Sequence, residues 1–182
     1  TLEADLIIFG TGFHQTVPFL SEQHMNCLTD ENGHFMLHRN ILPAGIPSLA
    51  FVGYNPSLYS NLTSEIGALW VCEYLKGNIQ VPVDSEIIKQ RKQFIQWRSR
   101  FRMKGDPRAI SVAPWSIKHA DELLRDMKAS LPLSSLIPDW LIVLNPSHYK
   151  KVKQKIMKRS GIKATAIKVT NFPGKVTLTP KT

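Results

Sequence analysis

The chain has 182 residues, with 23 Lys and Arg against 14 Asp and Glu, two Cys and no apolar run near twenty residues. This composition excludes a membrane-spanning segment in the sequence and a small fold held by disulfides. With 43% hydrophobic residues the chain can build a core of ordinary domain size. It starts at Thr1 without Met and reaches an apolar run by Leu6, so we expect a piece of a longer protein.

Charge divides the chain in two. Residues 150–182 hold ten Lys and Arg and no acid, whereas residues 1–149 are close to neutral. We therefore expect a basic tail at residues 150–182 and consider it a candidate for disorder. Cys27 and Cys72 show no C-x-x-C spacing, which indicates reduced thiols, a cytoplasmic compartment and no metal site.

Two short apolar runs end in glycine. Asp5–Phe9 is followed by Gly10-Thr11-Gly12, and Leu49–Val52 is followed by Gly53. Runs of this length bounded by turn residues are typical of strands buried on both faces of a sheet. We therefore predict two buried strands, each ending in a glycine loop.

The remaining elements follow from turn residues and helical periodicity. Turn residues at 30–33 followed by alternation over His34–His38 predict an edge hairpin or meander strand. Residues 62–76 predict a buried helix with Asn61 as its N-cap and Gly77 at its C-cap. We further predict an amphipathic surface helix at 84–103, whose basic face includes Arg91. A shorter helix should follow at 117–128, with breaks at Pro132 and Pro138 and a last strand at 140–144.

This order of elements is typical of an α/β nucleotide-binding sheet, whose ligands lie beyond the carboxyl ends of the strands. The free N–H groups at the start of the 62–76 helix would face an anion or the polar edge of a cofactor ring.

Gly10-Thr11-Gly12 is not a dinucleotide fingerprint, because Gln15 stands where G-x-G-x-x-G needs glycine and Pro18 stops a following helix. An ordinary turn at the glycines and a purely capping role for Asn61 and Ser64 stay open.

Ordered motifs extend over residues 1–149. They are Asp5–Phe13, Leu37–Pro43, Pro47–Tyr54, Ser60–Ile66 with Trp70, Asp121–Met127 and Asn145–Tyr149. In this order they resemble the flavin-containing monooxygenases. The first resembles that family's "D-hydrophobic run-A-T-G-Y" strand, with Gly10 for Ala and Phe13 for Tyr. The next three resemble its return into the FAD domain and the helix start that faces the flavin, and the last two resemble its "D-e-L-x-R-D-m" helix and closing "P-x-x-Y".

The resemblance implies an enzyme that uses FAD, NADPH and O₂ to oxygenate nitrogen or sulfur centres of small molecules. It also implies an upstream part with two glycine fingerprints, which this sequence lacks, so we expect the C-terminal portion, inactive on its own. Residues 1–80 would complete a Rossmann-like FAD-binding domain, 81–149 would form a helical extension, and 150–182 the basic tail. The substrate and the catalytic residues are not identified.

By the same resemblance, the cofactor-binding candidates are Gly10, Thr11, Gly12, Gly53, Asn61, Thr63 and Ser64. At the glycines the backbone would pass close to the cofactor, because a side chain there would clash. The three polar residues of the helix start would direct N–H groups or hydroxyls toward the pyrimidine edge of the flavin, where negative charge develops on reduction.

The basic residues support a second hypothesis, a non-catalytic remnant that binds partners or an anionic surface through its basic helix and tail. Nucleic acid fits poorly, because Phe172 is the only aromatic residue after Tyr149. Weak contact with a membrane surface fits the charge better.

His34 and His38 cannot share a metal ion, since four residues of strand separate them by ~13 Å.

Overall fold

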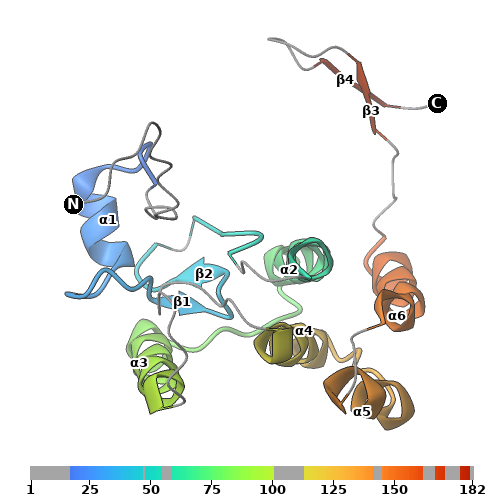
Figure 1. Cartoon of the computed structure of the whole chain (residues 1–182). Coiled ribbons are helices and arrows are strands. Elements are labelled where there is room, and N and C mark those ends of the chain that lie inside the picture. Colours follow the sequence, from blue (N-terminus) through green and yellow to red (C-terminus); the bar gives the residue numbers. More distant parts are fainter. Residues whose placement is uncertain are drawn as a thin grey trace, which may run out of the picture.

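The computed structural model describes residues 17–46, 48–54, 59–100, 113–141, 145–161, 167–170 and 177–180. Its elements in chain order are α1 (Glu22–Leu28), β1 (Leu37–His38), β2 (Leu42–Pro43), α2 (Ser60–Leu75), α3 (Asp84–Arg100), α4 (Ala113–Asp126), α5 (Leu133–Leu141), α6 (Pro146–Arg159), β3 (Ile167–Thr170) and β4 (Thr177–Pro180). Figure 1 shows the β1–β2 hairpin at the centre, α1 above it, α3 below it, and α2, α4, α5 and α6 to its right. The predicted strand Asp5–Phe9 and the glycine loop after it lie outside the described residues.

A short hairpin forms where the alternating pattern predicted one. Leu37–His38 pairs antiparallel with Leu42–Pro43. In the turn before it, a carboxylate oxygen of Asp30 accepts the N–H groups of Asn32 and His34 at 3.0 and 2.8 Å. The turn and the hairpin are confirmed, although regular pairing covers only two residues of each strand.

Helix α2 is central to the main core. Its buried residues share one face: Leu62, Thr63, Ile66, Gly67, Leu69, Trp70 and Glu73. At 3.6 residues per turn they cover less than half of the circumference, and Leu75 is 76% exposed, so the predicted helix is buried on one face only. Gly77 ends the helix as predicted, with a φ of 75°. The Asn78 N–H reaches the Glu73 carbonyl at 3.0 Å and the Gly77 N–H reaches the Tyr74 carbonyl at 2.8 Å, which is a Schellman motif. Helices α4 and α6 pack against this helix.

Helix α3 follows the predicted span, but one of its basic residues does not face solvent. Arg91 is only 5% exposed. Its Nε donates to the Phe35 carbonyl at 3.1 Å and its Nη1 donates to the Asn40 Oδ1 at 2.9 Å. The prediction of a solvated basic face is wrong at this position, because Arg91 lies one turn after the buried Ile87 and shares its face.

The apolar run Leu49–Val52 does not form the predicted strand. The Phe51 N–H donates to the Ile41 carbonyl at 2.8 Å, and Val52 is 49% exposed. A strand buried on both faces needs hydrogen-bonded neighbours, and no strand in the described part of the chain pairs with this run. The run instead covers the hairpin, with the Phe51 ring centroid 5.7 Å from that of Phe35.

The prediction of a last strand at 140–144 is wrong for Trp140 and Leu141, which end α5. Residues 142–144 lie outside the described part. Pro132 does not interrupt a helix. It directly precedes α5, and its carbonyl accepts the Leu136 N–H at 3.0 Å. Pro138 is the sixth of the nine residues of this helix, where it removes one backbone hydrogen bond without ending the helix, so the predicted break there is wrong.

The first part of the predicted basic tail is ordered helix. Residues 150–159 make up most of α6, which begins after Asn145, whose side chain accepts the Ser147 N–H at 3.0 Å. Tyr149 and Ile156 are 0% exposed and anchor this helix in the main core. Across the described ranges the chain forms helices and two antiparallel hairpins and no parallel sheet. None of these helices is long and apolar enough to span a membrane.

Candidate functional site

The loop that ends at Gly53 meets the start of α2. Gly53 has a φ of 93°, a conformation that residues with a Cβ rarely adopt. A Cβ added there would lie 2.8 Å from the Ser64 Oγ. The structure thus places these two predicted residues side by side, and a Cβ at position 53 would require the Ser64 side chain to shift.

The first turn of α2 differs in detail from the prediction. The helix begins at Ser60, and Tyr59 occupies the N-cap position without a side-chain hydrogen bond to the helix. The prediction of Asn61 as the N-cap is therefore wrong, and this residue is exposed within the first turn. Thr63 is buried, and its hydroxyl is placed to donate to the Tyr59 and Ser60 carbonyls, each 3.1 Å away.

The described part of the candidate cofactor site therefore has three features. It has a glycine that lets the backbone approach the helix, the half-buried Ser64, and a helix start whose N–H groups are not capped by the Tyr59 side chain. The N–H groups at this helix start present hydrogen-bond donors and the positive end of the helix dipole. Such an arrangement suits a ligand that becomes negatively charged. Thr63 presents no free donor here, because its N–H reaches the Tyr59 carbonyl at 3.0 Å and its hydroxyl lies against the Tyr59 and Ser60 carbonyls. Gly10, Thr11 and Gly12 lie outside the described residues.

A separate cavity of about 210 Å³ lies between the β1–β2 turn, α3 and α4. Three cationic side chains, Arg39, Arg91 and Lys118, line it together with Glu122. His119 also lines it and is 6% exposed. The sequence analysis missed this cavity, because residues more than 50 positions apart build it.

Both histidines of this cavity are held neutral. Burial lowers the pKa of His38 to about 4, with a further contribution from the Arg39 charge. Burial likewise lowers the pKa of His119 to about 4, helped by Arg39 and Arg91 and opposed by Asp126. At neutral pH each ring therefore carries one N–H donor and one acceptor nitrogen.

Asp126 connects three elements beside this cavity. Its carboxylate accepts the Arg39 Nε and Nη2 at 2.8 and 2.9 Å, a two-point ion pair. It also accepts the indole N–H of Trp70 at 3.0 Å. One carboxylate thus fixes the hairpin turn and α2 to the end of α4. Asp126 belongs to the motif at 121–127 quoted above, yet nothing in that motif indicated this role.

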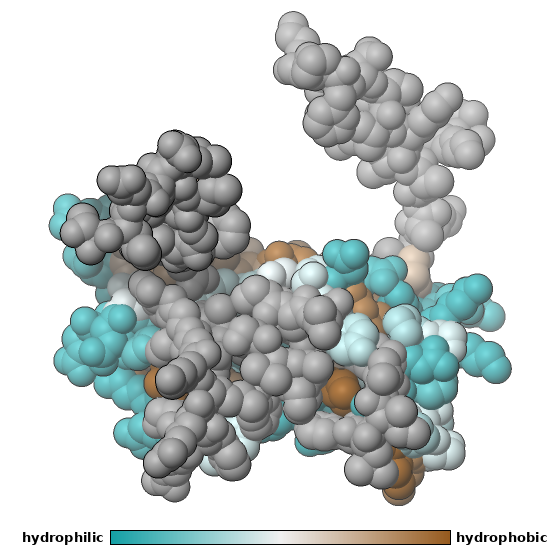
Figure 2. All heavy atoms as spheres, in the orientation of Figure 1, coloured by the Kyte–Doolittle hydropathy of each residue, from teal (hydrophilic) through white to brown (hydrophobic). Residues whose placement is uncertain are grey.

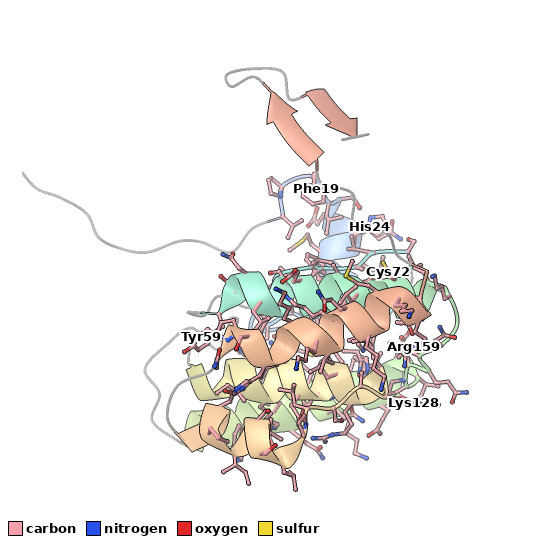
Figure 3. All side chains as sticks on the ribbon, turned by 90° about the vertical axis from the view of Figure 1, so that its right-hand side faces the viewer. Phe19, His24, Tyr59, Cys72, Lys128 and Arg159 are labelled. Atoms are coloured by element: carbon pink, nitrogen blue, oxygen red, sulfur yellow. The ribbon has the colours of Figure 1, made fainter. Side chains whose placement is uncertain are left out.

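A second cavity, of about 300 Å³, lies at the C-terminal end of α2 and is lined by Glu73, Asn78, Asp126, Met127, Lys128 and Arg159. Figure 3 shows Lys128 and Arg159 together at one end of the helices and Tyr59 at the other. Glu73 is 1% exposed; burial alone would raise its pKa, but bonds from Ser160, Asn78 and Arg159 lower it overall. This arrangement joins α2 to α6.

No group of three or more His, Cys, Asp or Glu able to hold a metal ion occurs within the described segments. His34 instead pairs with Asp30, its Nδ1 lying 2.9 Å from the Oδ2. Cys27 and Cys72 form no disulfide.

The sequence matches the family model described as flavin-binding monooxygenase-like over residues 2–139. It is 36% identical over 138 residues to flavin-containing monooxygenase 1 of Oryctolagus cuniculus, covering 73% of this chain and 24% of that protein. It is 30% identical over 138 residues to flavin-containing monooxygenase 1 of Rattus norvegicus, covering 73% and 25%. It is 28% identical over 132 residues to putative flavin-containing monooxygenase 2 of Arabidopsis thaliana, covering 70% and 28%. The chain spans about a quarter of the length of these relatives, and the match over most of its residues shows that it belongs to the flavin-binding monooxygenase-like family.

Proposed function

We propose that the chain is the C-terminal portion of a flavin-dependent monooxygenase that uses FAD, NADPH and O₂ to oxygenate nitrogen or sulfur centres of small molecules. The observation that carries the proposal is the family match over residues 2–139. The contact between Gly53 and Ser64 at the uncapped start of α2 supports it, because the family resemblance places a flavin ring against this helix start.

At this helix start, backbone N–H groups would meet the flavin ring edge. The N–H groups of Ser60, Asn61 and Leu62 precede the first intrahelical bond, in which the Thr63 N–H reaches the Tyr59 carbonyl. They would stabilise the charge that collects on the pyrimidine edge of a reduced flavin. Ser64 would add one hydroxyl, and Gly53 lets the loop lie close to this residue.

The bound flavin would supply the redox chemistry with O₂, while the chain would orient the ring and shield it. Residues of the missing glycine fingerprints would have to hold the FAD and NADPH pyrophosphates, because this sequence contains no G-x-G-x-x-G. We therefore expect this chain to contribute to ring binding and not to pyrophosphate binding.

The test is a titration of the 182-residue chain with FAD and, separately, with lumiflavin, which is the ring without the phosphates. Flavin fluorescence and absorbance report binding, and NADPH absorbance reports turnover. We expect weak binding of equal strength for both flavins and no NADPH oxidation. No binding of either flavin would contradict ring binding by this chain, and tight FAD binding with NADPH oxidation would contradict the expected incompleteness.

Two variants locate the ring on the helix start. Ser64→Ala removes the hydroxyl without strain and should weaken lumiflavin binding severalfold. Gly67→Ala is the matched control, because the added Cβ would lie 3.6 Å from Ile41 Cδ1, an ordinary contact. Equal affinities for the two variants would argue against Ser64 as a ring contact.

A second candidate function rests on the surface of α6. Lys150, Lys151, Lys155 and Lys158 of this helix are all exposed. Figure 2 shows hydrophilic residues gathered at its right-hand edge, where α6 lies in Figure 1. We propose that this basic face gives weak attraction to an anionic membrane surface, at about 1 kcal/mol for each lysine near the surface.

Co-sedimentation with vesicles tests this surface. The chain should bind vesicles that contain phosphatidylserine more strongly than vesicles of phosphatidylcholine alone. Neutralising Lys151 and Lys155 to Gln should weaken binding by about tenfold or more, whereas neutralising Lys89 and Lys92 on α3 should not. Binding that is the same in both variants would rule out the α6 face.

A further inference from the structure

The turn between α1 and the β1–β2 hairpin contains Asn32-Gly33, the one Asn-Gly pair of the 182 residues. Asn32 is exposed, and no described residue forms a hydrogen bond with its side-chain amide. A Cβ added at Gly33 would meet nothing within 4 Å, so the space beside this glycine is open. Because glycine has no side chain, its backbone nitrogen is the least hindered one that an asparagine side chain can meet.

An asparagine side chain beside an unhindered backbone nitrogen can react without an enzyme. The Gly33 nitrogen attacks the Cγ of Asn32 and forms a new C–N bond. The side-chain nitrogen of Asn32 leaves as ammonia, taking up the proton that the Gly33 nitrogen gives up. Water then adds to one carbonyl carbon of the cyclic imide and breaks one of its C–N bonds, which leaves aspartate or isoaspartate at position 32. Nothing is oxidised or reduced, and water is the only other reactant.

The turn hinders this reaction for as long as it stays closed. The Gly33 N–H donates to the Asp30 carbonyl at 2.9 Å, and this bond must break before the nitrogen can lose its proton and attack. The Asp30 carboxylate holds both sides of the reacting pair, because one of its oxygens accepts the N–H groups of Asn32 and His34 at 3.0 and 2.8 Å. The rate of the reaction should therefore depend on how often the turn opens locally.

An isoaspartate at position 32 would not fit the closed turn. It runs the main chain through the former side chain, which adds one carbon atom to the backbone. The turn lies inside the bridge that pairs Thr29 with Phe35, and Phe35 is 2% exposed in a hydrophobic cluster. A longer backbone cannot keep this bridge and the bonds to Asp30 in the same register. The modified chain should therefore be less stable than the parent chain.

We infer that Asn32 is a site of spontaneous deamidation and that the turn held by Asp30 controls its rate. The closed turn keeps the proton on the Gly33 nitrogen, whereas each opening exposes an unhindered Asn-Gly pair to water. The inference concerns a covalent change in the chain itself and does not depend on flavin binding.

The test is incubation of the 182-residue chain at slightly alkaline pH, with samples taken over time. Peptide mapping by mass spectrometry follows each asparagine and separates the aspartate and isoaspartate products. We expect conversion at Asn32 and none at Asn78, whose N–H and side-chain amide both bond to Glu73 and which precedes the buried Ile79. The chain unfolded in guanidinium chloride gives the rate without the turn, which should be higher. An Asn32 that stays intact in the folded chain while it converts in the unfolded chain would overturn the inference.

Two alanine variants test the control by the turn. Asp30→Ala removes the carboxylate that holds the turn and should raise the conversion rate at Asn32 about fivefold or more, the factor that corresponds to the loss of one ordinary hydrogen bond. Glu31→Ala is the matched control, because Glu31 is exposed and lies in the same turn. Equal rates in the two variants would overturn the role of the turn. Circular dichroism shows whether each variant is folded, and if Asp30→Ala unfolds, equal rates for the parent chain with and without guanidinium chloride would overturn that role instead.

Discussion

Lowering the pH should destabilise the chain well before its carboxylates become protonated, because of two buried histidines. His38 is packed at 6.0 Å from Trp70 between ring centroids, and His119 lies on the buried face of α4. The charged groups that face them are Arg39, Arg91 and Asp126. Burial and the arginines lower both pKa values to about 4, and the single carboxylate does not offset this.

The sign and size follow from proton linkage. A histidine in the unfolded chain has a pKa of about 6.5, so between about pH 6.5 and pH 4 the unfolded state binds more protons than the folded state. The free energy of unfolding therefore falls as pH falls through this window. From pH 7 to pH 5 each histidine should lower it by about 2 kcal/mol, or about 4 kcal/mol together.

Urea unfolding followed by tryptophan fluorescence at intervals from pH 8 to pH 5 measures this dependence. His119→Gln should reduce the slope by about half, because one of the two buried rings is removed. His24→Gln, at an exposed position of α1, should leave the slope as it is in the parent chain. A free energy of unfolding that stays constant between pH 7 and pH 5 would refute the reasoning.

Three further predictions concern stability. Gly53→Ala should lower the free energy of unfolding by about 1–3 kcal/mol, because of backbone strain and the contact with Ser64. Gly67→Ala inside α2 should raise it by about 0.5–1 kcal/mol. Thermal unfolding of both variants checks this difference in sign. Asp126→Asn should lower the free energy of unfolding by about 2–4 kcal/mol, and Glu86→Gln should lower it by less than about 0.5 kcal/mol. Similar urea midpoints for the two variants would contradict the structural role given to Asp126. Tyr149→Phe should leave the Tm unchanged or raised, since the buried hydroxyl has no hydrogen-bond partner in the described part of the chain, and a clear fall in Tm would reveal one.

Local patterns predicted the elements whose determinants lie close together in sequence. The helix from 62 to 76 was predictable because its apolar residues and Gly77 are local signals, and the structure ends α2 through that glycine. The turn at Asp30 was predictable for the same reason. Leu49–Val52 was not, because the same apolar run can pair in a sheet or fold over a hairpin, and the choice depends on distant neighbours.

The candidate site was likewise predictable only where its residues belong to a local motif. The motif resemblance gave the family, and the structure brings Gly53 and Ser64 together. The burial of Arg91 and His119 could not be read from helical periodicity, since a basic or imidazole side chain counts as polar in any such pattern. Arg91 donates to Phe35 and Asn40, which lie beside and within the hairpin and not on α3.

The carboxylate of Asp126 also bears on the order in which the chain assembles. Its bonds to Arg39 and Trp70 join residues 87 and 56 positions apart, and the bond between Arg159 and Glu73 spans 86 positions. Contacts of this separation form only after long loops have closed, later than the helices themselves. We expect Asp126→Asn to accelerate unfolding more than it slows folding, which stopped-flow kinetics would measure. The same carboxylate that fixes the hairpin would then set how long the folded chain lasts, rather than how quickly it forms.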